Sequence, residues 1–143
     1  MLKSCLSSPL DKDTYGSLGL LVGRLMFGLI MAFAHGMGKV PPPQGLVDGV
    51  TAMGLPFPGF LAWSAGLAEF AGGLLIAAGL LTRPAALLWI VTMLVAAFVA
   101  HGADPFQKKE LALLYLSFSV VLLGLGGGKF SLDNLLARRP SKS

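Results

Sequence analysis

Two ionisable residues, Arg24 and Glu69, lie inside long apolar stretches where charge is otherwise rare. An unpaired charge in hydrocarbon costs about 2.5 kcal/mol or more, so such residues are usually paired or functional. Arg24 lies about seven residues into the first stretch and Glu69 about eleven from the end of the second, which predicts depths only ~6 Å apart. They are candidates for a structural ion pair, for the lining of a polar pocket that holds a quinone head group, a proton or a small substrate, or for contact with a partner subunit.

Glu69 is predicted to point between helices rather than at lipid. The residues at helical spacing from it, Ala62, Gly66 and Gly73, are small enough for a neighbouring helix to approach closely. We therefore expect Glu69 to face the helix that carries Arg24, through a direct or water-bridged contact.

Two histidines end predicted helices at the same face of the membrane. His35 and His101 lie in identical Ala-His-Gly tripeptides, a faint sign of a duplicated hairpin. Each is a candidate for a hydrogen bond to loop backbone or water, for a haem or metal ligand, or for a ligand-binding or proton-handling group. No ligand spacing in the sequence favours a metal.

Other polar residues cluster near these histidines, at positions 39, 104 and 108–110. We predict a pocket that opens toward this outer face, walled by His35, His101, Glu69 and Glu110, with Lys39 at its rim and Arg24 as its floor. The opposing expectation is that helices packed through glycines leave no cavity and that the rim residues simply face water.

The elements that must position these residues are membrane-spanning helices. Hydrophobic residues make up 55% of the 143 residues and charged residues 13%, and the mean hydropathy is +0.75, whereas a soluble domain carries about a quarter charged residues. Apolar runs predict helices over about 17–37, 59–81, 84–100 and 110–126. The expected fold is all-α, a single domain over 1–143 that forms an integral membrane four-helix bundle. A short interfacial segment is expected between the first two helices.

Charge outside these runs predicts the topology. Seven lysines and arginines lie in the N-terminal tail, second loop and C-terminal tail, and three lie in the other two loops. The positive-inside rule then places both termini in the cytoplasm of a multi-pass protein. Ala32-Phe33-Ala34 is similar to a signal-peptidase site. The first apolar run is longer than the 7–15-residue apolar region of a signal peptide, so we expect a membrane span rather than a cleaved signal.

Several kinds of site are excluded by composition. The single cysteine, Cys5, excludes a disulfide or thiolate metal centre within one chain. The glycine-rich stretch 124–130 lacks the spacing of a phosphate-binding loop. The basic residues are scattered rather than clustered, which argues against a nucleic-acid partner and leaves the lipid bilayer as the expected one.

The chain resembles the DoxX family of membrane proteins over roughly residues 17–133. The resemblance rests on a set of short motifs, each weak alone, which are Arg24, His35-Gly36 with Lys39, Gly54-Leu55-Pro56, Ala68-Glu69-Phe70-Ala71-Gly72-Gly73, Gly79-Leu80-Leu81-Thr82-Arg83, His101-Gly102, Glu110 and Gly128-Lys129-Phe130-Ser131-Leu132-Asp133.

This resemblance implies a bacterial inner-membrane protein, with no cofactor of its own, in a quinone-linked redox complex whose redox centre lies on a partner protein. Some relatives are similar to the membrane subunit of a thiosulfate:quinone oxidoreductase, which by position assigns quinone contacts to Arg24, His35 and Glu69. The alternatives are a non-enzymatic scaffold or assembly factor for a partner and, last, a small oligomeric transporter. The sequence does not decide whether the protein is itself an enzyme, nor whether it forms a homo-oligomer.

Overall fold

A computed structural model of the protein describes residues 12–137, and every regular element in that range is a helix. Two of the helices continue into π-helical segments, a wider form of helix that interrupts the regular hydrogen-bond pattern. In chain order the elements are α2 (Lys12–Ile30), η1 (Met31–Gly36, π-helical), η2 (Met37–Lys39, 3-10), α3 (Gln44–Ala52), α4 (Pro58–Ala78), α5 (Thr82–Leu94), η3 (Val95–Ala100, π-helical), α6 (Phe106–Leu125) and α7 (Leu132–Ala137).

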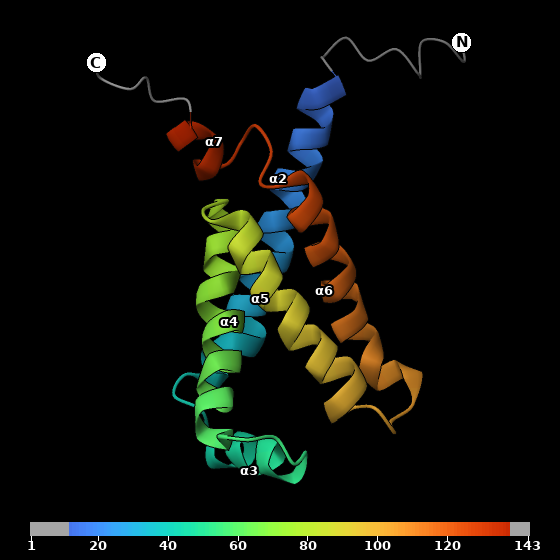
Figure 1. Cartoon of the computed structure of the whole chain (residues 1–143). Coiled ribbons are helices and arrows are strands. Elements are labelled where there is room, and N and C mark those ends of the chain that lie inside the picture. Colours follow the sequence, from blue (N-terminus) through green and yellow to red (C-terminus); the bar gives the residue numbers. More distant parts are fainter. Residues whose placement is uncertain (1–11, 138–143) are drawn as a thin grey trace.

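The long helices pack side by side in chain order. α2 and η1 contact α4, α4 contacts α5, and α5 contacts α6. α6 reaches back to α2 through the stacked rings of Phe27 and Phe118, whose centroids are 4.4 Å apart. The start of α2 and α7 lie at one end of the molecule, and α3 lies across the opposite end (Figure 1). We call these the α7 end and the α3 end.

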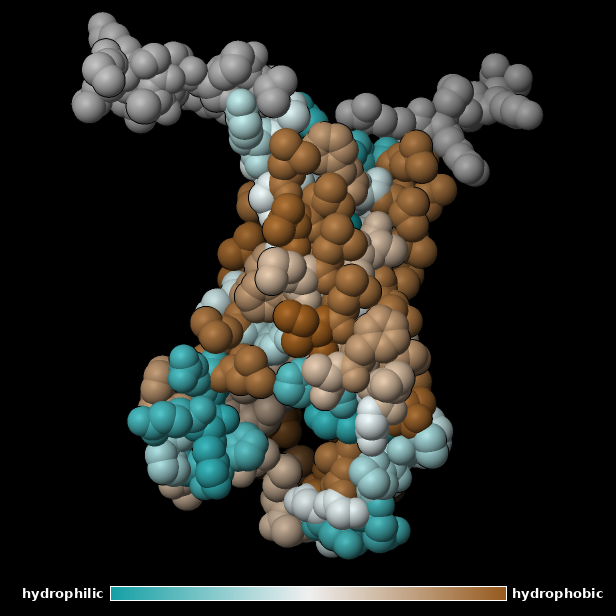
Figure 2. All heavy atoms as spheres, turned by 180° about the vertical axis from the view of Figure 1, so that it is seen from behind, coloured by the Kyte–Doolittle hydropathy of each residue, from teal (hydrophilic) through white to brown (hydrophobic). Residues whose placement is uncertain are grey.

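Three helices are long and apolar enough to cross a membrane, namely Thr14–Lys39, Pro58–Ala78 and Thr82–Ala100. Their outward side chains are large and apolar, such as Met26, Phe33 and Val91, and hydrophobic atoms cover the middle of the molecule (Figure 2). α6 has similar length but carries Lys108, Lys109 and Glu110 near its start. The protein is therefore an all-helical membrane protein with three candidate spans in its described part.

Glycines bring α4 into backbone contact with the first long helix. A Cβ atom at Gly28 would lie 2.6 Å from the Gly73 carbonyl oxygen, and one at Gly36 would overlap the backbone of Phe70. Close approach of this kind is how membrane helices gain packing energy in the absence of a hydrophobic driving force. The contacts fix the register, with Gly28 beside Gly73 and Gly36 beside Phe70.

Trp89 joins three helices at the centre of the core. Its fully buried indole N–H donates to the Ala68 carbonyl of α4 at 2.9 Å. Its ring meets Tyr115 of α6 edge to face, with centroids 5.4 Å apart. Satisfying the indole N–H while burying the ring is the arrangement that makes tryptophan favourable in a core.

The observed helices differ from the sequence-based bounds mainly at their polar ends. The first begins at Lys12 rather than 17 and continues through Lys39 rather than ending at 37, and the last begins at Phe106 rather than 110. Lysine and glutamine, which occur in these extensions, are good helix formers, so a helix extends past the apolar run that defines it. The predicted segment between the first two long helices is confirmed as a helix, α3, while its position at a membrane surface stays a prediction.

Asp133 of α7 accepts hydrogen bonds at the start of α5. Its carboxylate takes the backbone N–H groups of Leu81 at 2.7 Å and Thr82 at 2.9 Å, a favourable place for negative charge at a helix N-terminus. Burial raises the pKa of the Asp133 carboxyl, but these N–H donors and the positive charge of Arg24 outweigh burial, so the pKa lies below its usual value. The contact holds α7 against the bundle.

We expect Asp133→Ala to lower the free energy of unfolding by about 1 kcal/mol at pH 7. A carboxyl whose pKa is depressed on folding stabilises above its unfolded pKa of about 3.9, and this stabilisation is lost as pH falls through the folded value. The gap between wild type and variant should therefore shrink below about pH 4, as measured by denaturant unfolding followed through tryptophan fluorescence. Asp48→Ala is the control, because Asp48 is exposed on α3 and accepts a hydrogen bond from the exposed Gln44. An equal gap at all pH values would contradict the assignment.

Candidate functional site

A cavity of about 150 Å³ lies at the α3 end, between η1, α4, η3 and α6. Its apolar wall is formed by Met31, Met93, Ala96, Leu111, Ala112 and Tyr115, and its polar residues are His35, Lys39, Glu69, His101 and Lys108. Figure 2 shows the more hydrophilic α3 end with a hollow in it. Met31, Met93 and Tyr115 are at most 4% exposed and form the deep part, whereas the side chains of Lys39, His101 and Lys108 are 33–64% exposed and form the mouth.

Both histidines are placed by π-helical segments. His35 lies in η1, and His101 directly follows η3. π-segments widen a helix by one residue per turn and occur frequently at functional sites. One Ala-His-Gly tripeptide thus forms the last three residues of η1 and the other spans the end of η3, and their histidines line the same cavity.

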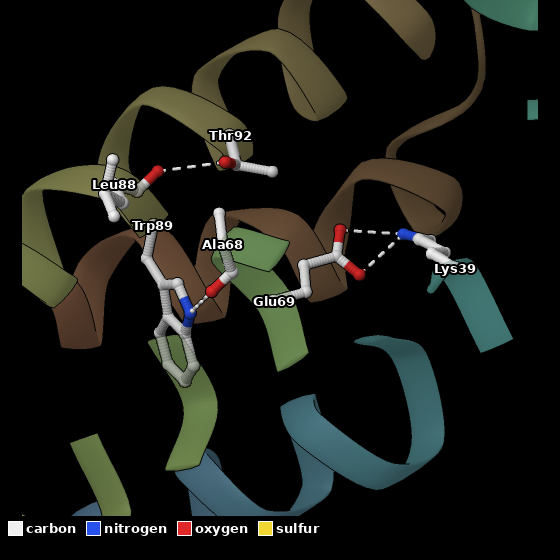
Figure 3. A network of polar contacts seen from close by, with 6 residues as sticks. All are labelled: Lys39, Ala68, Glu69, Leu88, Trp89 and Thr92. Carbon is white, nitrogen blue, oxygen red and sulfur yellow. Dashed lines mark hydrogen bonds and ion pairs between the residues drawn. The ribbon is translucent and has the colours of Figure 1, made fainter. Parts of the chain in front are cut away.

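Glu69 is paired with Lys39. Lys39 Nζ lies 2.7 Å from Oε1 and 2.6 Å from Oε2 of the carboxylate, as Figure 3 shows. The Glu69 side chain is 5% exposed and points into the bundle, as the sequence predicted. A buried carboxylate of this kind requires such a charged, hydrogen-bonding partner.

The predicted proximity of Arg24 to Glu69 is wrong. The glycine contacts place Glu69 beside Gly36, whereas Arg24 lies against the last turn of α4 at Ile76 and Ala77. Seven residues of α4 separate Glu69 from Ile76, about 10 Å along the helix. Arg24 is also absent from the cavity lining, so it is not the pocket floor.

Arg24 instead binds carbonyl groups at the α7 end. It is fully buried, its Nη2 donates to the Phe130 carbonyl at 2.7 Å, and its Nη1 donates to the carbonyls of Ile76 and Ala77 at 3.4 Å. The last carbonyls of a helix have no partner within that helix, and a cation also favours the helix dipole there. Arg24 thus joins α2, the end of α4 and the segment after α6.

His101 belongs to a small charged network at the mouth. Its Nδ1 lies 2.8 Å from Asp104 Oδ2, and Lys108 Nζ lies 3.7 Å from the other oxygen. The hydrogen bond to His101 lowers the pKa of the Asp104 carboxyl, and the charge of Lys108 does so as well. Asp104 therefore holds the ring so that Nε2 remains for another partner.

Glu110 does not belong to the site. It is exposed and is not part of the cavity lining, although the sequence predicted that it walls the pocket. α6 begins at Phe106, so Glu110 lies in its second turn on the solvent side. Its neighbour Lys109 donates to the Gly102 carbonyl and closes the α5–α6 connection.

Three residues of the deep wall, Met31, Met93 and Tyr115, were not predicted as site residues. The Tyr115 ring meets His35 edge to face at 6.1 Å, and the structure gives neither its hydroxyl nor the His35 ring nitrogens a hydrogen bond to another described residue. Helical spacing from His35 to Met31 was the one signal available, since residues four apart share a face. In the described part of the chain, His, Cys, Asp and Glu side chains form no group of three that could hold a metal ion.

Comparison with known proteins agrees with the fold and the apolar helices. The DoxX family model matches residues 19–102. The chain is similar to the inner membrane protein YqjF of Escherichia coli (strain K12), at 34% identity over 85% of this chain and 95% of that protein. It is also similar to a Bacillus subtilis (strain 168) protein named "Putative oxidoreductase CatD", at 29% identity over 79% of this chain and 82% of that protein. No solved structure matches the chain. The family match covers more than half of the chain and includes Arg24, His35, Glu69 and His101, so the protein belongs to the DoxX family of membrane proteins.

Proposed function

We propose that the protein is the membrane subunit of a quinone-linked redox complex and that its cavity holds the ring of a quinone. The observation that carries this proposal is the cavity itself, an apolar space within the bundle whose mouth carries ionisable groups from several elements. Binding sites for small organic molecules have this composition, with mostly apolar walls and a few converging polar groups.

The size of the cavity favours a ligand with a single ring. An engineered apolar cavity of about 150 Å³ holds one benzene molecule, and the cavity here has a volume of about 150 Å³. The six-membered ring of a quinone therefore fits, while its substituents and isoprenoid tail would extend through the open mouth of the cavity. Met31, Met93 and Tyr115 supply soft, polarisable contacts for the ring faces.

The polar groups of the mouth match the two oxygens of such a ring. A para-quinone has two carbonyl oxygens at opposite ends, each of which accepts hydrogen bonds. His35 comes from the first helix and His101 from the end of η3, so the two imidazoles approach the cavity from different sides. The neutral ring of His35 has one N–H to donate. In His101 the Nδ1–H donates to Asp104, so its Nε2 donates to a quinone oxygen when the ring carries a second proton.

The redox centre that exchanges electrons with the quinone belongs to a partner protein in this proposal. The single cysteine excludes a thiol pair within the chain, and the relative named as an oxidoreductase supports a redox role. α6 is proposed as the fourth membrane span, since its 20 residues reach about 30 Å. The seven-to-three charge distribution supports cytoplasmic termini in the bacterial inner membrane, with α3 on the opposite surface.

The proposal predicts that the protein in lipid nanodiscs binds duroquinone, a single-ring quinone without a tail. In a Trp63→Phe background the remaining tryptophan, Trp89, contacts Tyr115 of the cavity wall, so binding is expected to quench its fluorescence. Ala96→Phe places a ring in the cavity and is expected to weaken binding at least about tenfold, equivalent to about 1.4 kcal/mol.

Ala100→Phe is the matched control, because Ala100 lies one turn further on in η3, is exposed and is not part of the cavity lining. It should bind duroquinone as the wild type does. Saturable binding that Ala96→Phe leaves unchanged, or no binding beyond that to empty nanodiscs, would reject the quinone site and favour a scaffold role.

A further inference from the structure

We infer that Lys39 and Glu69 form the route by which protons from the α3 end reach the ring, an inference that rests on the proposed function. Conversion of a quinone to a hydroquinone consumes two electrons and two protons, and each C=O becomes C–O–H. The electrons come from a reduced flavin or metal centre of the partner, and the protons must come from water.

The chemistry of the cavity requires such a route. A two-electron reduction places negative charge on the ring oxygens inside a space walled by Met31, Met93 and Tyr115, where the charge is poorly solvated. Protons must therefore arrive together with the electrons. A proton carrier has to touch the cavity on one side and water on the other.

Glu69 is the one carboxylate in the lining of this cavity, and Lys39 connects it to solvent. The Glu69 side chain is 5% exposed and that of Lys39 is 33% exposed, while Nζ contacts both carboxylate oxygens at 2.6 and 2.7 Å. Figure 3 shows the pair between α4 and the end of the first helix. The two side chains form a continuous hydrogen-bonded path from the interior to the surface.

The ion pair responds directly to the charge of the ligand. Negative charge on the ring repels the Glu69 carboxylate, and transfer of a proton to that carboxylate removes the repulsion. A proton then passes from Lys39 Nζ to a Glu69 oxygen and from Glu69 to the ring oxygen, after which water reprotonates Lys39. The ring receives two electrons and two protons in total, one of the protons through Glu69, so the hydroquinone that forms is neutral.

The other ionisable groups around Glu69 do not provide a second buried path for protons from the α3 end. His35 of η1 and Tyr115 of α6 face it across the cavity, and His101 and Lys108 lie at the mouth. The His101 side chain is 43% exposed, so it exchanges protons with water directly and serves the second ring oxygen. Toward the α7 end, Ile76 and Trp89 are fully buried and apolar and offer no proton carrier.

The test measures reduction of duroquinone bound to the protein in nanodiscs, with dithionite as electron donor and stopped-flow absorbance as readout. We expect Glu69→Gln to bind duroquinone within about threefold of the wild type and to slow reduction about 100-fold, the usual contribution of a positioned acid or base. A solvent isotope effect in D₂O should be present in the wild type. Glu110→Gln, an exposed glutamate at the same end, should behave as the wild type.

Lys39→Arg separates proton transfer from a purely structural role. Arginine keeps the charge and the ion pair with Glu69 but does not lose its proton in proteins. If protons pass through Lys39 and Glu69, Lys39→Arg should also slow reduction at least tenfold with unchanged duroquinone affinity. If the ion pair is only structural, Lys39→Arg should reduce duroquinone at the wild-type rate. Normal reduction rates in both variants would overturn the proton route but not the quinone site. A wild-type protein that binds no duroquinone would overturn the quinone site and the proton route together.

Discussion

Replacement of Arg24 by methionine is expected to lower the free energy of unfolding by at least about 3 kcal/mol. The variant keeps the bulk of the side chain but leaves the carbonyls of Phe130 and Ala77 without the Arg24 donor, while the Ile76 carbonyl keeps only the Gly79 N–H. A buried carbonyl that loses its partner costs about 1–3 kcal/mol, and bonds from a charged donor contribute the most. Denaturant unfolding in detergent, followed by tryptophan fluorescence, measures the change.

Two further variants test the reason for this loss. Arg24→Lys keeps the charge, but one ammonium group does not reach both the Phe130 carbonyl and the end of α4, so an intermediate loss is expected. Arg83→Met is the control, because Arg83 is exposed and, within residues 12–137, its side chain donates only to the Gly124 carbonyl. Duroquinone affinity of folded Arg24→Lys should match the wild type. A stable Arg24→Met protein that loses the ligand would mean that Arg24 serves the cavity.

Much of the fold could be predicted because lipid imposes a simple rule on sequence. A helix that crosses hydrocarbon must be apolar for about 20 residues, so hydropathy located the long helices. The prolines at 41–43 and at 56 and 58 bounded α3. The polar turns at the helix ends were missed because the helix bounds were taken from the apolar runs alone. Lys39 was therefore assigned to a loop, whereas it ends the first helix and faces α4.

The partner of each buried charge depended on helix register, which hydropathy does not specify. Depth estimates placed Arg24 and Glu69 at nearly the same level, but the contact of Gly28 with Gly73 sets them about two turns of helix apart. The partners of Arg24 are backbone carbonyls, which every sequence position provides and no residue type reveals. For Glu69 the available signal was the i,i+4 spacing of His35 and Lys39 on one helix face.

The cavity exists because the α3 end departs from regular helix geometry. Regular packing through glycines would close the bundle, which was the opposing expectation from the sequence. Both η1 and η3 instead widen by π-turns where they reach the cavity, and α5 diverges from α4 toward the α3 end (Figure 1). No residue pattern in the sequence predicts a π-turn. The polar residues of the cavity could therefore be predicted, but the apolar residues that form its walls could not.

The second large effect is expected from Gly36→Ala, a change of one methyl group between η1 and α4. An alanine Cβ at this position would overlap the backbone of Phe70 and Glu69 in the middle of α4, and helix backbone cannot turn aside as the end of a flexible side chain can. Overpacking against a rigid neighbour costs about 1–3 kcal/mol or more. η1 is expected to move away from α4 and to carry Lys39 and His35 with it, so that stability and duroquinone binding fall together.

Gly19→Ala supplies the matched control on the same long helix. A Cβ at Gly19 has no atom within 4 Å, so alanine there should leave the fold unchanged or stabilise it by up to about 1 kcal/mol through helix propensity. Gly28→Ala adds a comparison at the other contact between the first long helix and α4, where a Cβ atom would meet the Gly73 carbonyl. It should lower the free energy of unfolding as Gly36→Ala does, yet disturb duroquinone affinity less, because it lies about 12 Å from Gly36 along the helix. Equal losses of affinity in both variants would show that binding follows global stability, and a loss confined to Gly36→Ala would show that the η1–α4 contact shapes the cavity.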